Sequence, residues 1–293
     1  MNLKKNLPQW LKDLVKRQIK NAKFKKFEQV AKHYATDDLV TYFKAAGFNK
    51  GDILFIHSSL RSLGYIEGGA KSVIEALKQV VGAEGTLVFP TFTMKLSMAD
   101  TLSDSTLVFD PKTTLSTVGS ITNAFLKMDG VYRSIHPTHS VAAWGKYAQF
   151  LTESHYQQET NFGPSTPFGK FLDLNGSIVG LGVNYAPITY YHVYEDYNID
   201  KFPKVYVSEP LKAKVLITGN IVETMVWCHD IDFHKTRIEK DPEVESFIRN
   251  YLEMNGFSTS HKICDGKLWY IKAQDLIREL EVLYNQGKTI YHV

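Results

Sequence analysis

The sequence predicts an α/β protein with a three-layer arrangement, in which a central, mostly mixed β-sheet is flanked by helices. Residues 50–90 have the pattern of a strand, an amphipathic helix and a second strand, which is typical of sheets covered by helices. The run 177–183 is almost purely apolar and contains bounding glycines, as expected for a central strand. Amphipathic patterns near 242–254 and 273–286 predict further helices.

The first 33 residues form a distinct segment, in which apolar residues recur at helical spacing. It holds ten Lys or Arg but only Asp13 and Glu28 as acidic residues, so its net charge is +8. The remaining 260 residues carry 24 basic and 29 acidic groups, a net charge of −5. We expect a basic amphipathic helical extension over residues 1–36 and one domain over residues 37–293. The extension can pack on its own body, contact a second subunit in a homodimer or, as a weaker alternative, rest on an anionic membrane through residues 1–33.

The elements that follow have local start and stop signals. Acidic residues can cap the first helix of the domain, glycines end the helices, and Pro90 ends the second strand. Residues 91–117 are rich in Thr, Ser and Asp and predict a long functional loop. The expected helices cover 37–46, 70–81, 118–127, 189–197, 242–254 and 273–286, and the expected strands cover 52–56, 85–89, 141–144, 177–183, 205–207, 214–218 and 225–228.

Composition limits the class of protein. The 293 residues are 44% hydrophobic and 22% charged, the profile of a globular chain that buries a core. No apolar run reaches the roughly 20 residues of a membrane span, and the N-terminus lacks the pattern of a secretory signal. Cys228 and Cys264 lack CxxC spacing, so a cytoplasmic location is expected. Basic residues are concentrated in the extension, which argues against a nucleic-acid partner.

Common catalytic and nucleotide motifs are missing from the sequence. There is no GxxxxGK[ST] loop and no GxSxG elbow. Gly180 and Gly182 lack the third glycine of a dinucleotide fingerprint. Ser58 and Ser59 follow a buried strand, where they can act as nucleophiles or simply satisfy loop backbone groups.

One pair of residues suits general-base chemistry. His192 and Glu195 lie three apart in an expected helix, so their side chains share a face. A carboxylate that holds a histidine fixes its tautomer and raises its basicity, although an exposed ion pair has the same spacing. The same residues allow a zinc site, in which His136, His139, His192 and Glu195 are the ligands.

Five stretches, taken together and in order over roughly residues 37–285, resemble the aminoglycoside 3-N-acetyltransferase (antibiotic N-acetyltransferase) family. The resemblance implies a fold unlike that of the GNAT acetyltransferases. The stretches are His57–Gly64 with Gly68-Gly69, Gly85–Thr93, Phe109-Asp110-Pro111, Arg133–Ser140, and Thr166–Gly169 leading to Leu181–Val183 and Thr189-x-x-His192-x-x-Glu195.

The resemblance implies an enzyme that moves acetyl from acetyl-CoA to a primary amine without a metal. His192 then matches the catalytic base and Glu195 its carboxylate neighbour. Acceptor contacts are expected at Phe92, Thr189 and Tyr191, and Arg61 and Arg133 are candidates for the CoA phosphates. The residues expected to line the acetyl-CoA site are His57, Ser58, Ser59, Leu60, Arg61, Thr93, Ser134, His136 and His139.

Two positions depart from the family pattern, and both bear on the acceptor. Ile188 stands where the family usually has Asn, and Thr166 stands where it usually has Ser. The cysteines fall outside the five stretches, so direct transfer without an acyl-enzyme is expected.

The acceptor itself is expected to be a small-molecule amine. Because the body is only mildly acidic, an amino sugar on a nucleotide carrier is favoured over a polycationic aminoglycoside. The sequence is also compatible with antibiotic acetylation, with a non-catalytic CoA- or sugar-binding protein, and with a zinc hydrolase.

Overall fold

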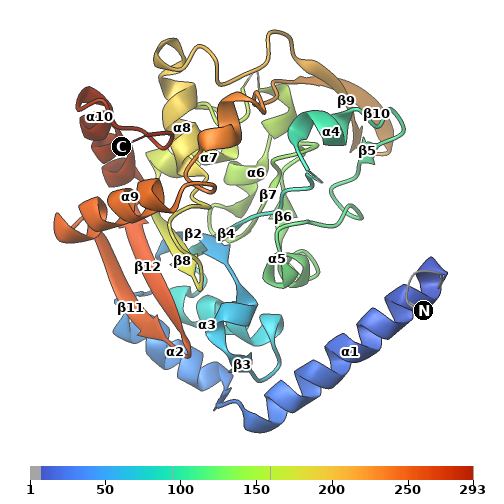
Figure 1. Cartoon of the computed structure of the whole chain (residues 1–293), viewed down its shortest axis with the longest axis vertical. Coiled ribbons are helices and arrows are strands. Elements are labelled where there is room, and N and C mark those ends of the chain that lie inside the picture. Colours follow the sequence, from blue (N-terminus) through green and yellow to red (C-terminus); the bar gives the residue numbers. More distant parts are fainter. Residues whose placement is uncertain (1–7, 95, 159, 293) are drawn as a thin grey trace, which may run out of the picture.

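The computed structural model describes residues 8–94, 96–158 and 160–292. A seven-stranded mixed sheet crosses the body in the order β11–β12–β8–β2–β4–β7–β6 (Figure 1). Strands β8, β2 and β4 are parallel to one another, and the remaining pairs are antiparallel. The strands are β2 (Ile53–Ser58), β4 (Thr86–Pro90), β6 (Tyr132–Arg133), β7 (Val141–Gly145), β8 (Ser177–Leu181), β11 (Ser258–Ile263) and β12 (Gly266–Lys272).

Helices cover both faces of this sheet, as the three-layer prediction requires. Alternate residues of β2 point to opposite faces: Phe55 joins one buried cluster, and Leu54 and Ile56 join the other. The cluster around Leu54 is covered by α2 (Thr36–Ala45), α3 (Ala70–Val81) and α5 (Ser120–Phe125). The cluster around Phe55 is covered by α6 (Ala148–Thr152), α7 (Pro167–Asp173), α8 (Tyr190–Tyr197), α9 (Pro242–Met254) and α10 (Ala273–Asn285).

Most predicted elements are confirmed, although the structure also contains elements that the sequence did not predict, such as α6 and α7. The helix expected over 70–81 is α3, and the apolar run at 177–183 is β8, buried between β2 and β12. The strand expected at 205–207 is wrong, because Tyr206 makes an isolated bridge to His229 instead. The hairpin β11–β12 was not predicted.

A smaller sheet includes part of the polar stretch 91–117. Its order is β10–β9–β5, and the helix α4 packs on it through Met98, which contacts a cluster that includes Cys228. The stretch expected as a loop therefore contains two short elements. The bounds are α4 (Met98–Leu102), β5 (Val108–Phe109), β9 (Leu211–Ile217) and β10 (Asn220–Val226), and the other short elements are β1 (His33–Tyr34), β3 (Tyr65–Ile66), η1 (Leu60–Leu63), η2 (His155–Gln157), η3 (Ile199–Lys201) and η4 (Phe233–Thr236).

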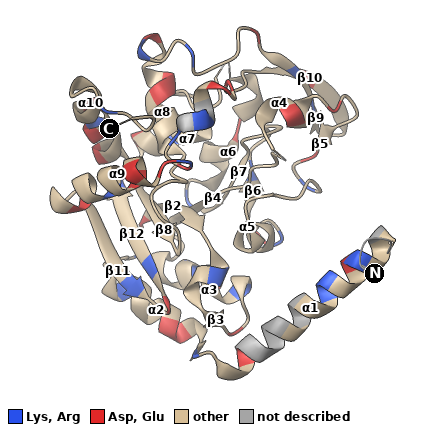
Figure 2. Cartoon of the chain, in the orientation of Figure 1, with Lys and Arg blue, Asp and Glu red and all other residues tan. Residues whose placement is uncertain are grey.

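The helix α1 (Gln9–Val30) projects away from the body (Figures 1 and 2). Its apolar side chains Trp10, Leu14 and Ile19 are about half exposed or more. Over residues 10–19 these exposures contradict the expectation that α1 packs on its own body, whereas Glu28 near its C-terminal end accepts the Tyr65 hydroxyl. Residues 1–7 lie outside the described residues. The other two roles, contact with a second subunit and contact with a membrane surface, stay predictions. In the described part of the chain, no helix is both long and apolar enough to cross a membrane.

The chain between β8 and α8 is held by one aromatic stack. Gly180 leaves room for Trp269, because a Cβ at this position would lie 2.0 Å from the indole ring. Trp269 stacks on Tyr185 with ring centroids 4.3 Å apart, and its indole N–H donates to the Val183 carbonyl at 2.8 Å. These contacts fix the loop that leads into α8.

Candidate active site

A cavity of about 710 Å³ opens at the carboxyl ends of the parallel strands. Ligands of open α/β sheets commonly bind at this edge. One side, here called the strand-end wall, consists of His57, Ser58, Phe92, Thr189 and His192. The opposite side, the loop wall, comes from the irregular segment after β10 and consists of His229, Ile231, Lys235, Arg237 and Lys240.

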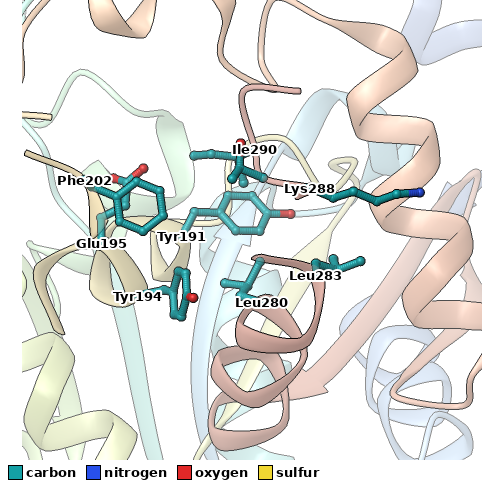
Figure 3. A pocket seen from close by; sticks show the side chains of 9 residues that line it. Tyr191, Tyr194, Glu195, Phe202, Leu280, Leu283, Lys288 and Ile290 are labelled. Carbon is teal, nitrogen blue, oxygen red and sulfur yellow. The ribbon is translucent and has the colours of Figure 1, made fainter. Parts of the chain in front are cut away.

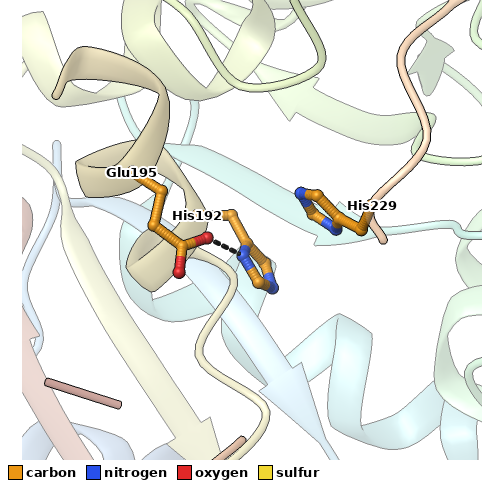
Figure 4. A group of neighbouring side chains, drawn as sticks. All are labelled: His192, Glu195 and His229. Carbon is orange, nitrogen blue, oxygen red and sulfur yellow. Dashed lines mark hydrogen bonds and ion pairs between the residues drawn. The ribbon is translucent and has the colours of Figure 1, made fainter. Parts of the chain in front are cut away.

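His192 and Glu195 form a buried pair on α8 (Figure 4). The Nδ1–H of His192 donates to Glu195 Oε2 at 2.5 Å, and Glu195 is 1% exposed. Tyr291, near the C-terminus, donates its hydroxyl to Glu195 Oε1 at 2.5 Å. Burial and the neighbouring carboxylate raise the pKa of Tyr291, so the phenol stays protonated. With both of its oxygens engaged, the carboxylate orients the imidazole so that Nε2 is the basic nitrogen.

Arg237 contacts that basic nitrogen. Its Nη1–H donates to His192 Nε2, while Nε and Nη2 donate to the two carboxylate oxygens of Glu239. A guanidinium is a donor only, so the contact requires an unprotonated Nε2. The tautomer is therefore the one that a general base needs, but its lone pair is covered by a cation.

His229 stands beside His192, with ring centroids 4.4 Å apart. Its ring is stacked between Phe162, at 5.6 Å, and Tyr206, at 5.0 Å. Asp196 anchors both neighbours, since it accepts the Tyr206 hydroxyl and the Phe162 N–H. Burial raises the pKa of Asp196 to about 6. This arrangement sets the plane of the His229 ring at the cavity wall.

The zinc ligand set suggested by the sequence is not assembled as a group. Potential ligand atoms of His192, Glu195 and His229 lie within 4.8 Å of one another, and His136 and His139 do not belong to this group (Figure 4). In the structure the Glu195 carboxylate serves His192 and Tyr291 through hydrogen bonds.

His57 lines the cavity, and it also fixes the start of α8. Its Nε2 accepts the Thr189 N–H at 3.4 Å. Burial lowers the pKa of His57 to about 3, so the ring is neutral and can accept this bond. Ser58 lines the cavity beside it, whereas Ser59 bonds Ser62 through its hydroxyl, at 2.9 Å. Leu60 and Arg61, in η1, do not line the cavity.

The loop 134–140 is mainly a brace. Ser134 Oγ accepts the Val141 N–H at 2.9 Å, and His136 Nδ1 accepts the His139 N–H at 2.9 Å. Of the predicted residues in this loop, His139 reaches the cavity. Burial, followed by the charges of neighbouring groups, lowers the pKa of His139, and burial lowers that of His136 to about 4.

Arg133 and Thr93 also have structural partners. Arg133 donates to the carbonyl oxygens of Thr91 at 2.9 Å and Thr114 at 2.5 Å, and to Ser140 Oγ at 3.2 Å. This guanidinium is committed to loop backbone, which corrects its expected role toward CoA phosphates. Thr93 donates its hydroxyl to the Pro137 carbonyl at 2.5 Å.

Of the expected acceptor contacts, Phe92 and Thr189 line the cavity, but Tyr191 does not. Tyr191 faces a small crevice on the other side of α8, against Leu280 and Ile290 (Figure 3). Its hydroxyl donates to the Tyr185 carbonyl at 3.0 Å, and the side chain is 2% exposed. Tyr191 thus holds α8 against α10 instead of contacting the cavity.

Three residues at the site were missed by sequence reasoning. Tyr291 stands 96 positions after its partner Glu195, and His229 and Arg237 lie in a stretch without regular periodicity. The dense mixture of histidines and charges over residues 229–241 was the available signal.

Comparison with known proteins assigns the family. The family model described as aminoglycoside 3-N-acetyltransferase matches residues 55–284. An aminoglycoside N(3')-acetyltransferase-like protein of Bacillus subtilis, YokD, is 33% identical over 179 residues, which span 56% of this chain and 64% of that protein. Aminoglycoside N(3)-acetyltransferase III of Pseudomonas aeruginosa is 28% identical over 251 residues, 82% of this chain and 89% of the relative.

Solved structures share the fold. The crystal structure of Bacillus subtilis YokD superposes with a TM-score of 0.72 at 24% identity, covering 90% of this chain and 98% of that one. A complex of the aminoglycoside acetyltransferase AAC-IIIb with CoASH has a TM-score of 0.70 at 18% identity, covering 88% and 98% of the two chains. Because the family model matches well over half of this chain, the chain belongs to the aminoglycoside 3-N-acetyltransferase family.

Proposed function

We propose that this chain is an acetyl-CoA-dependent N-acetyltransferase that acts on a primary amine of an amino sugar. The observation that carries the proposal is the buried His192–Glu195 pair beside a large cavity in a chain of this family, with an unprotonated Nε2 that Arg237 contacts. His192 is the general base, and Glu195 holds its tautomer with the help of Tyr291.

The transfer needs one proton acceptor and one leaving thiol. His192 Nε2 takes a proton from the acceptor nitrogen as that nitrogen attacks the thioester carbonyl carbon. The N–C bond forms, the C–S bond breaks, and the proton passes to the sulfur, which leaves as the thiol of CoA. Holding both reactants side by side supplies much of the remaining rate enhancement.

The developing oxyanion needs hydrogen-bond donors near the thioester carbonyl. Ser58 and Thr189 are the expected residues that reach the cavity with polar groups. Ser59 and Thr93 have other hydroxyl partners, which makes them weaker candidates. The cavity's apolar lining, with Ile56, Pro90 and Val183, fits an acyl-pantetheine arm.

Two acceptor classes remain as candidates. Aminoglycosides are one class, because the names of the relatives give them as substrates. Nucleotide-linked amino sugars are the other class, and the cationic loop wall favours them. A non-catalytic CoA- or sugar-binding protein would not need the intact His192–Glu195 pair. A zinc hydrolase would require bound metal, which elemental analysis of the purified protein would detect.

The decisive experiment incubates the protein with acetyl-CoA and a panel of amines and measures released CoA thiol. The panel spans aminoglycosides and nucleotide-linked amino sugars, and mass spectrometry identifies the acetylated product. We expect amine-dependent thiol release from at least one of the two classes. Binding of CoA without turnover on any amine would contradict the proposal and favour the binding protein.

A further inference from the structure

The loop wall concentrates positive charge at the cavity. Lys235, Arg237 and Lys240 line it, and Glu239 is the acidic residue among the described lining residues. His57 and His139 add no charge near neutral pH, because burial lowers the pKa of each. A polycationic acceptor would meet like charges here, whereas an anionic one would be attracted.

The two lysines are available to a ligand. Lys240 is exposed, and Lys235 is exposed and pairs with Asp232. Asp230 also attracts Lys235, and neither aspartate lines the cavity. The Lys235–Asp232 pair is solvent-exposed at both ends and therefore weak, so an incoming anion can compete for Lys235.

Arg237 connects this charge to catalysis. Its guanidinium donates to His192 Nε2, the nitrogen that must accept the proton of the acceptor amine. A guanidinium keeps its proton at physiological pH, so acceptor and Arg237 cannot use Nε2 at the same time. The other two nitrogens of the guanidinium donate to Glu239. An anion that competes for this guanidinium would draw Arg237 away from His192, whereas a cationic acceptor would not.

We propose that residues Lys235, Arg237 and Lys240 form a phosphate-binding site for the acceptor, and that the bound phosphate releases Arg237 from His192. The inference rests on the proposed acetyl transfer and specifies its substrate class, a phosphorylated or nucleoside-diphosphate-linked amino sugar. The phosphates of CoA have the same chemistry, so the test separates donor from acceptor.

The test compares wild type with the double variant Lys235→Gln/Lys240→Gln and with Arg237→Gln. The acceptors are glucosamine, glucosamine 6-phosphate, uridine-diphosphate-glucosamine and kanamycin, assayed by thiol release. Lys44→Gln is the matched control, because Lys44 is an exposed cation on α2, at the opposite face of the sheet. Calorimetric titration with CoA alone measures the donor, and titration with the phosphorylated sugars on the CoA-loaded protein measures the acceptor without requiring turnover.

In wild type, kcat/KM for at least one phosphorylated acceptor should exceed that for glucosamine and kanamycin by roughly tenfold or more, the effect of one charge-assisted contact. In the double lysine variant, kcat/KM should fall more for the phosphorylated acceptor than for glucosamine, so that the preference is lost while the Kd for CoA is retained. Arg237→Gln should also reduce the ratio of kcat/KM for the phosphorylated acceptor to that for glucosamine. Turnover of glucosamine should rise, because His192 Nε2 is no longer covered. Lys44→Gln should behave as wild type.

Three results would overturn the inference. The first is a wild-type preference for kanamycin that the lysine variant leaves intact. The second is a lysine variant that loses CoA affinity without changing acceptor preference, and the third is a failure of the phosphorylated sugars to bind the CoA-loaded protein. Calorimetric binding of a phosphorylated sugar without any thiol release supports the phosphate site and contradicts the proposed transferase activity. The two failures are therefore distinguishable.

Discussion

The strand-end wall and the loop wall of the cavity are held in different ways. The strand-end wall follows β2 and enters α8, and a backbone N–H at the start of α8 bonds buried His57. The charged residues of the loop wall lie in turns and in η4 after β10, and Lys235 and Lys240 are exposed. A general base must stay within hydrogen-bond reach of its substrate, whereas charge attraction tolerates mobile side chains. The proposed chemistry therefore belongs to the strand-end wall, and the proposed choice of acceptor belongs to the loop wall.

The largest expected effect is the loss of kcat when the general base of the strand-end wall is removed. His192→Ala should lower kcat by about 10²–10⁴-fold, because the acceptor loses its general base, while the Kd for CoA is retained. Steady-state thiol release and calorimetry measure the two quantities. His261→Gln, in β11, is a matched control and should keep its kcat. Near wild-type turnover of His192→Ala would place the chemistry elsewhere.

Acidification should lower the free energy of unfolding. At and behind the strand-end wall, burial lowers the pKa values of four histidines, His57, His136, His139 and His155. A histidine unprotonated in the fold but titrating near 6.5 when unfolded stabilises the fold fully above pH 6.5, and this contribution falls as the pH drops toward the folded pKa. Between pH 7 and pH 5 the loss should be about 2 kcal/mol each for His57 and His136.

Thermal melts across that pH range provide the measurement. His57→Gln retains an acceptor for the Thr189 N–H and should flatten the pH dependence. His33→Gln should not, because hydrogen bonding to the Glu28 carbonyl raises the pKa of this exposed histidine. A melting temperature that is unchanged from pH 7 to pH 5 would mean that the buried rings do not stay neutral.

The next prediction concerns the hydrogen bonds by which Arg133 holds the loops next to the strand-end wall. Arg133→Ala removes donors to the carbonyls of Thr91 and Thr114 and should cost about 2–4 kcal/mol of unfolding free energy. Chemical denaturation gives this value, and Lys146→Ala, which breaks an exposed pair with Glu84, should change the free energy of unfolding far less. If Arg133→Ala instead weakened CoA binding at unchanged stability, Arg133 would have the phosphate role expected from the sequence.

The smallest expected effect concerns the cysteines. Burial raises the pKa of Cys228 to about 11 and that of Cys264 to about 12, so neither thiol is a ready nucleophile at neutral pH. The double variant Cys228→Ala/Cys264→Ala should keep kcat within about twofold at 25 °C, since neither thiol takes part in the chemical step. Mass spectrometry of the enzyme during turnover should find no acetylated cysteine, and its detection would rule out direct transfer.

How far the sequence predicted the fold depends on how local each signal is. The helix α3 begins after Gly69 and ends before Gly82, and both boundaries can be read from neighbouring residues. The β11–β12 hairpin turns through Cys264 and Asp265, with Cys264 at a φ of 51°, a conformation that Asn or Gly usually adopts. Without that signature the alternating strands on either side were overlooked.

The same distinction applies to the site. His192 and Glu195 lie one helical turn apart, so their spacing alone predicts the contact. Arg237 reaches His192 across 45 positions, through irregular chain whose path depends on tertiary packing. Tyr191 shares α8 with His192 but faces the other way, and a family motif does not specify this difference.

The contact between Arg237 and His192 also affects how an acetyl donor would fare while no acceptor is bound. A thioester beside an uncovered general base is open to hydrolysis, because a water molecule can give its proton to the imidazole and attack the carbonyl. With Arg237 on Nε2, that water has no base, and the acetyl group is conserved until an acceptor arrives. Acetyl-CoA incubated with the protein alone should therefore release thiol slowly, and the Arg237→Gln variant should hydrolyse acetyl-CoA faster. Equal rates of hydrolysis would mean that Arg237 does not protect the donor.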